Sequence, residues 1–255
     1  MVDSDHSQGA SAPAGEKATL SVIMPVHNED RTLRAIIGKV LAATELVNIE
    51  LIVVDDGSAD DSRAIIRELA AGHPNIRVHL QEPNQGKGAA VRRGIELAAG
   101  QWILIQDADL EYDPADYDRL LEPALAGRAD AVFGSRFAAG SRNQALHCWQ
   151  RLANRLLTGL ANLLNGLELT DMETCYKLVR AEVLKGLALR SRSFTIEPEL
   201  TTRLAQRGAR ICEVPISYRG RTRAEGKHPR RRDALKAVWA LFYYRFVKAS
   251  TRGSS

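Results

Sequence analysis

Short apolar runs alternate with longer amphipathic stretches between residues 20 and 135. Short apolar runs predict buried strands, and apolar residues that recur at three- and four-residue steps predict helices. Strands are predicted at 20–25, 49–54, 76–80, 102–105 and 129–133, and helices at about 28–46, 60–71, 88–100 and 114–125. Because strand and helix alternate, we expect an α/β fold with a Rossmann-like, mainly parallel sheet, right-handed crossovers and helices on both faces.

The pattern changes after residue 136 and indicates a C-terminal amphipathic helical region. Strands are predicted at 175–180 and 210–218, and helices at 143–167, at 197–207 and from 233 to about 248. The helix at 143–167 carries a regular apolar stripe, formed by Leu146, Trp149, Leu152, Leu156, Leu160, Leu163 and Leu167. A membrane interface is one interpretation of this stripe. A stripe at helical spacing more often packs in a core, and we expect core at 152–164. The last helix is the better candidate for a membrane interface, because aromatic and basic residues are combined there.

Length and composition favour a single large domain. The chain has 255 residues, of which 45% are hydrophobic and 26% charged, as in ordinary globular proteins. We expect a disordered leader at 1–17, one domain at 18–249 and a flexible tail at 250–255. The leader lacks the pattern of a signal peptide, and no apolar run has the length of a membrane span. Cys148, Cys175 and Cys212 are scattered, which is typical of reduced thiols in a cytoplasmic protein.

Positive charge is concentrated near the C-terminus, although the net charge is only +4. Arginine and lysine crowd residues 219–252, where Glu225 and Asp233 are the only acids. Such a segment favours an anionic partner, which on charge alone is nucleic acid, acidic lipid or a phosphorylated substrate; a solvated basic tail is the alternative. We expect no nucleic acid, because the chain lacks zinc-finger spacing and an RNP-like aromatic pattern.

Two carboxylates follow the apolar run at 102–105. Asp107 and Asp109 are one residue apart, and alternate side chains of an extended chain project the same way. A hard divalent cation, Mg²⁺ or Mn²⁺, that carries a diphosphate is the usual partner of such a pair. A pair of loop aspartates before the next helix is the competing interpretation, since Asp113 and Pro114 follow with N-cap chemistry.

Acidic or glycine-rich segments also follow other predicted strands. Asp55, Asp56, Gly57 and Ser58 come after the second strand, where a carboxylate can bind a base or ribose or can cap a helix. Lys87 lies between two glycines at a helix N-terminus, a natural place for phosphate. The P-loop pattern is absent, which argues against a P-loop kinase or ATPase. Ligand chemistry is therefore expected at one edge of the sheet, beyond the carboxyl ends of the strands.

Taken in order, these segments resemble the signature of inverting family-2 glycosyltransferases with the GT-A fold. The resemblance is carried by 22–29 (VIMPVHNE), 53–58 (VVDDGS), 84–88 (NQGKG), 107–109 (DAD) and 134–136 (GSR), and it extends through 171–177 (DMETCYK) and 213–218 (EVPISY). Within that family the likeness is greatest to the dolichyl-phosphate mannose synthase and polyprenyl-phosphate glycosyltransferase group.

The resemblance implies a role for each matching residue. It implies a nucleotide pocket of Pro25, His27, Glu29, Asp55 and Asp56. It places Asp107, Ala108 and Asp109 at the metal and diphosphate, with Lys87 against the donor. Arg136 matches an arginine that binds the acceptor phosphate. From their positive charge alone, Arg219, Arg221, Arg223 and Lys227 are further candidates for that contact. Asp109, Arg136 and Asp171 are the expected catalytic residues.

The expected activity is a metal-dependent transfer of mannose or glucose from a GDP- or UDP-linked donor to a polyprenyl or dolichyl phosphate. Two alternatives stay open: transfer to a soluble hydroxyl acceptor, with Asp171 or Glu173 as general base, and binding of a nucleotide sugar without transfer. We expect a cytoplasmic protein in peripheral contact with an anionic membrane at the inner face of the cell membrane. The oligomeric state is left open.

Overall fold

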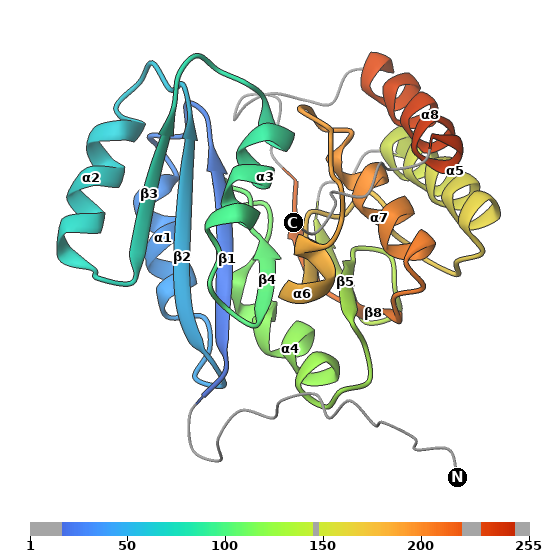
Figure 1. The fold of residues 1–255 in the computed structure, drawn as a ribbon, viewed down its shortest axis with the longest axis horizontal. Helices are drawn as coiled ribbons and strands as arrows, with labels where there is room; N and C mark the ends of the chain where they lie inside the picture. The colour runs from blue at the N-terminus through green and yellow to red at the C-terminus, as the bar shows by residue number, and fades with distance from the viewer. Residues whose placement is uncertain (1–16, 145–147, 221–230, 248–255) are drawn as a thin grey trace, which may run out of the picture.

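A seven-stranded sheet with strand order β3-β2-β1-β4-β7-β5-β8 forms the centre of the molecule (Figure 1). This computed structural model describes residues 17–144, 148–220 and 231–247. The strands of the sheet are β1 (Thr19–Val26), β2 (Asn48–Asp56), β3 (Ile76–Gln81), β4 (Trp102–Ile105), β5 (Ala131–Ser135), β7 (Lys177–Arg180) and β8 (Ile211–Pro215). A second sheet pairs β6 (Arg142–Gln144) with β9 (Ser217–Arg219).

Helices cover both faces of the main sheet, as predicted. They are α1 (Leu33–Leu41), α2 (Ser62–Gly72), α3 (Lys87–Leu97), η1 (Pro114–Asp116), α4 (Tyr117–Leu125), α5 (Cys148–Asn165), α6 (Ala181–Lys185), α7 (Ile196–Gln206) and α8 (Arg231–Phe246). The connections β1-α1-β2 and β2-α2-β3 advance in one direction across the sheet, whereas β3-α3-β4 returns past β1. Right-handed crossovers therefore put α3 on the opposite face from α1 and α2.

The sheet is mainly parallel, and β7 is its exception. β1 pairs in parallel with β2 and β4, and β5 pairs in parallel with β8. β7 runs antiparallel between β4 and β5. It thereby carries the segment at 171–176, which precedes it, to the edge where the other strands end.

Three predicted elements differ most from the structure in their extent. The strand predicted at 210–218 is two strands, because β8 pairs with β5 whereas β9 leaves the main sheet to pair with β6. The helix predicted at 28–46 is only Leu33–Leu41, since the backbone at 28–30 is held by side chains from the loop after β2 and from the first residue of α2. The long helix begins at Cys148, and the first residues of the predicted helix, 143 and 144, belong to β6 instead.

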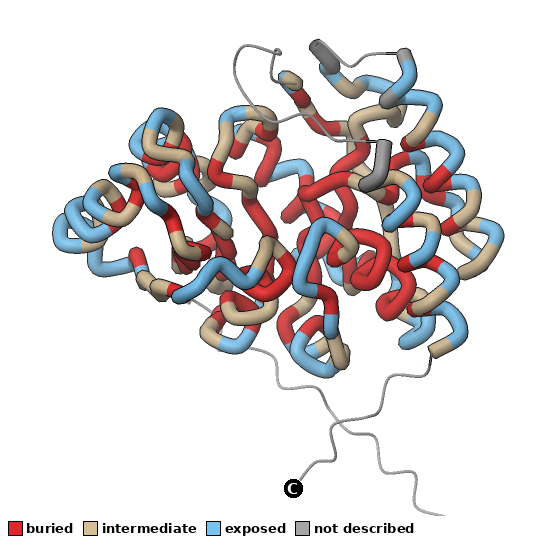
Figure 2. Tube along the Cα trace, turned by 90° about the horizontal axis from the view of Figure 1, so that it is seen from above, coloured by how far each residue is buried: buried red, intermediate tan, exposed pale blue. Residues whose placement is uncertain are grey.

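The hydrophobic core lies between the sheet and its helices, and a smaller cluster lies between α5 and α8. Figure 2 shows that buried residues fill the middle of the molecule and that exposed residues lie at its outside. In α5, Leu157 and Ala161 belong to that cluster, which confirms part of the predicted core at 152–164. The prediction is wrong for Leu152, Leu156 and Leu163, which are 60%, 66% and 82% exposed. No helix in the described ranges is long and apolar enough to cross a membrane.

Candidate active site

The loops that follow β1 and β2 are tied together at the carboxyl edge of the sheet. Asn28 has a φ of +57°, and its backbone N–H donates to Ser58 Oγ at 3.0 Å. Its side-chain Oδ1 accepts from the backbone N–H of Ala59 at 2.8 Å. The backbone N–H of Glu29 donates to Ser62 Oγ at 3.0 Å. Asparagine tolerates this left-handed conformation better than most residues, which explains its place at the turn.

Asp56 organises the glycine-rich loop before α3. Its two carboxylate oxygens accept the backbone N–H groups of Gln85 and Gly86 at 2.7 and 2.8 Å. Its carbonyl oxygen accepts from Asn84 Nδ2 at 2.9 Å and lies 3.0 Å from His27 Nδ1. The predicted pocket residue thus shapes the loop that carries Lys87.

A hollow of about 530 Å³ lies at the ends of β2 and β3, and the five residues predicted for the nucleotide pocket are not among those that line it. It is lined by Gly57, Ser58, Arg63, Glu82, Pro83 and Asn84. Asp55 is fully buried, and its Oδ2 lies 2.7 Å from Arg63 Nε, so it supports a lining residue from inside. Pro25 is half-buried opposite Val54 in the sheet. The structure therefore gathers Pro25, His27, Glu29, Asp55 and Asp56 at one end of the sheet.

Lys87 joins two carboxylates at the N-terminus of α3. Its Nζ lies 2.8 Å from Asp107 Oδ1 and 2.9 Å from Glu197 Oε1. Burial alone lowers the pKa of Lys87, but the neighbouring negative charges, chiefly Asp107, hold it well above its usual value. Glu197 was not predicted; its sequence signal is weak, because it is one of two acids, with Glu199, in the first turn of α7.

Asp107 and Asp109 lie half-buried directly after β4, as predicted. Asp109 Oδ1 accepts from the backbone N–H of Glu111 at 3.1 Å, and Thr32 Oγ1 donates to the carbonyl of buried Ala108 at 2.8 Å. Within the described residues, no group of three or more histidine, cysteine or acidic side chains could hold a metal ion. Mg²⁺ is usually held by one or two carboxylates together with substrate phosphates, so the donor chemistry of this aspartate pair fits such an ion.

Arg136 and Asp171 form a buried bidentate ion pair after β5. Arg136 Nε and Nη2 lie 2.7 and 2.9 Å from the two carboxylate oxygens, and the Arg136 backbone N–H donates to Asp171 Oδ2 at 3.0 Å. The Asp171 side chain is fully buried, and that of Arg136 is 11% exposed. The guanidinium also lies 5.0 Å from the centroid of the Tyr218 ring. This geometry fixes the plane of the arginine fork.

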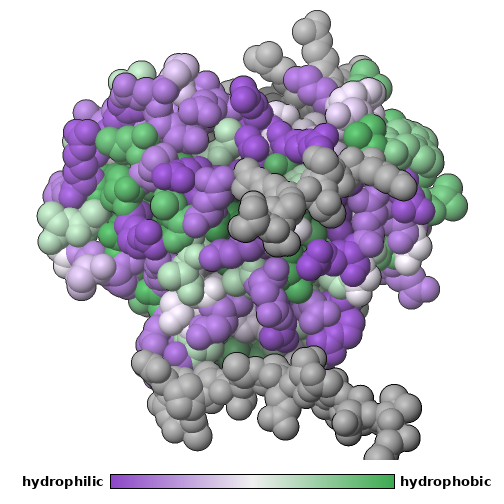
Figure 3. All heavy atoms as spheres, in the orientation of Figure 1, coloured by the Kyte–Doolittle hydropathy of each residue, from purple (hydrophilic) through white to green (hydrophobic). Residues whose placement is uncertain are grey.

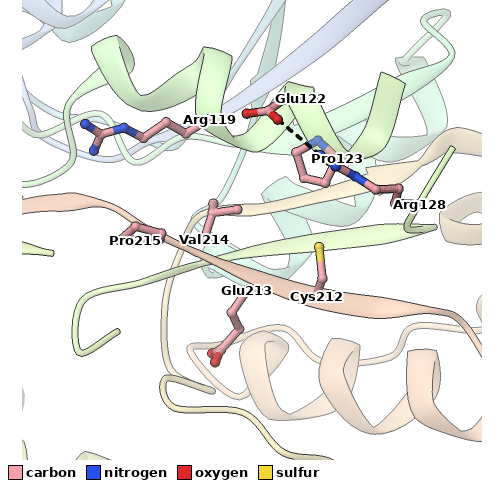
Figure 4. A pocket seen from close by; sticks show the side chains of 8 residues that line it. All are labelled: Arg119, Glu122, Pro123, Arg128, Cys212, Glu213, Val214 and Pro215. Carbon is pink, nitrogen blue, oxygen red and sulfur yellow. Dashed lines mark hydrogen bonds and ion pairs between the residues drawn. The ribbon is translucent and has the colours of Figure 1, made fainter. Parts of the chain in front are cut away.

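Glu213 holds the segment that carries Asp171. Its carboxylate accepts the backbone N–H groups of Thr170 and Asp171 at 2.7 and 3.0 Å. A separate hollow of about 360 Å³ lies between α4 and β8. Figure 4 shows its lining side chains, and Glu213 points away from Arg119 and Glu122 there. The Glu213 carboxylate therefore binds the segment that carries Asp171, on the other side of β8.

The carboxyl group of Glu173 is influenced by charges from both parts of the site. Burial, and then the negative charge of Glu197, raise the pKa of Glu173 to about 7, while Lys177 and Arg136 act in the opposite direction. Its Oε1 is buried and has no hydrogen-bond partner among the described residues. The pKa of Glu173 therefore depends on Glu197, which pairs with Lys87, and on Arg136.

The remaining predicted residues belong to the basic segment. Arg219 is exposed at the end of β9, and its backbone N–H donates to the carbonyl of Glu111 at 2.8 Å. Arg221, Arg223 and Lys227 lie outside the described residues.

Comparison with known proteins identifies relatives along most of the chain. The model of the glycosyl transferase family 2 domain matches residues 21–187. A polyprenol monophosphomannose synthase from Mycolicibacterium smegmatis is 33% identical over 94% of this chain and 95% of its own length. A dolichol-phosphate mannosyltransferase from Pyrococcus furiosus is 28% identical over 82% of this chain, which spans only 58% of that relative. An undecaprenyl-phosphate 4-deoxy-4-formamido-L-arabinose transferase from Aeromonas hydrophila is 30% identical over 82% of this chain and 62% of its own length.

Solved structures share the fold. Glucosyl-3-phosphoglycerate synthase from Mycobacterium tuberculosis, in complex with UDP, superposes with a TM-score of 0.67 at 23% identity, over 91% of this chain and 82% of that one. Another structure of that synthase, with Mn²⁺, UDP and glucosyl-3-phosphoglycerate, gives a TM-score of 0.67 at 22% identity, with the same coverage. The fold is therefore GT-A. Together with the domain match, these relatives show that the chain is a glycosyltransferase that belongs to glycosyl transferase family 2.

Proposed function

We propose that this chain transfers a hexose, mannose or glucose, from a GDP- or UDP-linked donor to a polyprenyl or dolichyl phosphate, with inversion at the anomeric carbon. The names of its relatives support a polyprenyl-phosphate acceptor, and the first of them matches over nearly the whole of both chains. Because the chain spans under two thirds of the other two, the argument for the acceptor also needs the geometry of the site.

The observation that carries the proposal is the pairing of the Asp171 carboxylate with Arg136. A hydroxyl acceptor needs a general base, whereas a lipid phosphate is already an anion and needs alignment. Asp171 is fully buried, and both of its oxygens accept hydrogen bonds from Arg136. It orients a guanidinium that is suited to a phosphate, and it is not placed to take a proton from an acceptor.

The donor would occupy the carboxyl edge between β2 and β4. The hollow beside Gly57 and Asn84 suits the nucleoside, with His27 and Asp56 next to it. Lys87 lies in reach of the diphosphate that Asp107 and Asp109 would share with Mg²⁺ or Mn²⁺. When bound, such an ion neutralises the charge that develops on the departing nucleoside diphosphate. Structures of the mycobacterial synthase with Mn²⁺ or Mg²⁺ support a divalent ion.

Transfer to a hydroxyl acceptor is the second candidate, and Glu173 favours it. A carboxyl group with a pKa of about 7 and an unpartnered buried oxygen has the properties of a general base. Replacing Glu173 with Gln distinguishes the candidates: transfer to a phosphate acceptor should persist, and transfer to a hydroxyl should be lost.

The test is to incubate the protein with UDP- and GDP-sugars and Mg²⁺ or Mn²⁺, with and without a polyprenyl phosphate, and to measure nucleoside diphosphate and glycolipid. Release that depends on the lipid phosphate is expected for one donor, and chelation by EDTA should stop it reversibly. Asp107→Asn or Asp109→Asn should lower the turnover rate by roughly 10²- to 10³-fold, because each variant loses an electrostatic contact that stabilises the leaving group. Asp118→Asn, an exposed site on α4, is the matched control. Unchanged turnover in both variants, or equal release without any lipid phosphate, would refute the proposal.

A further inference from the structure

The outer sides of α5 and α8 carry large apolar side chains that the protein does not bury. On α5 these are Trp149, Leu152, Leu156 and Leu163, and on α8 they are Leu235, Trp239, Phe242 and Phe246. The exposed fraction of each of them is between 43% and 82%. We call these eight residues the apolar face.

The spacing shows that each helix has two apolar sides. With about 100° per residue, the four exposed positions of each helix fall within a narrow sector. The buried positions of α5 include Leu157 and Ala161, and those of α8 include Ala237 and Leu241. They lie on the opposite side, where α5 and α8 contact each other and α7. Internal packing is therefore already satisfied without the apolar face.

The two stripes occupy one region of the surface. Figure 3 shows hydrophobic residues gathered on the right-hand side of the molecule, over the helices that Figure 1 labels α5 and α8. Monomeric soluble proteins seldom expose contiguous apolar surface of this kind, and where it occurs it usually marks an interaction site. Trp239 stacks on Tyr243 with 4.6 Å between ring centroids, an amphipathic aromatic pair of the type found at membrane interfaces.

The charges on these helices indicate whether the apolar face fits a second copy of the chain or a lipid surface. Arg151 and Arg155 on α5, and Lys236 and Arg245 on α8, are exposed. The sequence of α5 contains no acidic residue, and that of α8 contains only Asp233. A second copy of the chain docked symmetrically would bring these cations together, which is unfavourable. An anionic lipid surface satisfies both the apolar and the cationic side chains.

We infer that the apolar face docks on an anionic lipid bilayer, with α5 and α8 lying in the plane of its interface. This inference deepens the proposed function, since a polyprenyl chain is held in a bilayer.

Helix α5 also contacts the segment that positions Arg136. Thr158, on the inner side of α5, accepts a hydrogen bond from the backbone N–H of Met172 at 3.0 Å, and Met172 is next to Asp171. The side chain of Asn162 bonds both the N–H and the carbonyl of Leu169. The helix in the membrane interface would thus hold the segment that orients Arg136.

Vesicle flotation tests the inference without donor or acceptor, so its outcome is independent of transferase activity. The protein is mixed with vesicles of phosphatidylcholine alone or of phosphatidylcholine with phosphatidylglycerol. The wild type should float with the anionic vesicles, less at high salt, and the emission of its tryptophans should shift to the blue. Leu156→Ser/Leu163→Ser should weaken binding on the order of 10- to 100-fold, because two side chains lose their apolar contact.

Leu46→Ser/Leu125→Ser is the matched control, because these leucines are 49% and 43% exposed outside the apolar face. Its binding should equal that of the wild type, and circular dichroism should show both double variants folded. The inference fails if the wild type does not float, if neutral vesicles bind it equally, or if the two double variants bind alike. It also fails if the chain forms a dimer that Leu156→Ser/Leu163→Ser abolishes, since the face would then be a contact between copies.

Discussion

Replacing Asp171 with Asn should destabilise the protein by an amount that the Arg136 geometry determines. Asp171 accepts three hydrogen bonds from Arg136, one from the backbone and two from the guanidinium. If the asparagine oxygen takes the place of Oδ2, two of these bonds persist, but the bond to Nη2 is replaced by a contact between two donors. One charge-assisted hydrogen bond in a buried site is worth about 1.5–3 kcal/mol, and a guanidinium without its counter-ion adds to the loss. The expected decrease in the free energy of unfolding is about 3 kcal/mol.

Urea unfolding followed by tryptophan fluorescence measures this decrease. With a slope of about 3 kcal/mol per molar urea, the midpoint of Asp171→Asn should fall by about 1 M. A double-mutant cycle with Arg136→Met isolates the pair, because Asp171→Asn should cost much less once the guanidinium is absent. The coupling energy should be roughly 2 kcal/mol or more. Additive losses in the two single variants would refute the view that Asp171 acts by orienting Arg136.

Two further predictions concern Glu173 and the loop before α3. Because the pKa of Glu173 is raised from its ordinary value of 4.5 to about 7, the native chain retains a proton that the unfolded chain releases. The free energy of unfolding should therefore fall as the pH rises from about 4.5 to about 7, and Glu173→Gln should flatten that decline in urea titrations; an unaltered decline would contradict the assignment. Gly86 has a φ of +94°, and a Cβ there would lie 2.1 Å from the carbonyl oxygen of Arg192, so Gly86→Ala should lose roughly 2–4 kcal/mol of stability. Gly38→Ala in α1, with open space around it, should be neutral or stabilising by up to about 1 kcal/mol, and thermal unfolding of the two variants separates strain from a general effect of alanine.

Local patterns in the sequence were sufficient for most of the fold. The apolar runs at 49–54 and 102–105 predicted β2 and β4, because a strand covered on both faces needs apolar side chains on both. Polar motifs after the strands predicted where the site lies, because parallel strands end at one edge. That reasoning placed Asp56, Lys87 and Asp107 together, and the structure confirms their proximity to the ends of β2 and β4.

Only the tertiary structure brought the later segments to that edge. β7 enters antiparallel between β4 and β5, so Asp171 meets Arg136, and α7 delivers Glu197 to Lys87. No local pattern encodes such pairings, because they depend on strand order and on which backbone a distant loop meets. The same limit applies to α5, where periodicity identifies an apolar stripe but not its neighbour. Leu157 is buried and Leu156 is exposed because α8 and the segment at 169–172 cover one side of that helix and nothing within the described chain covers the other.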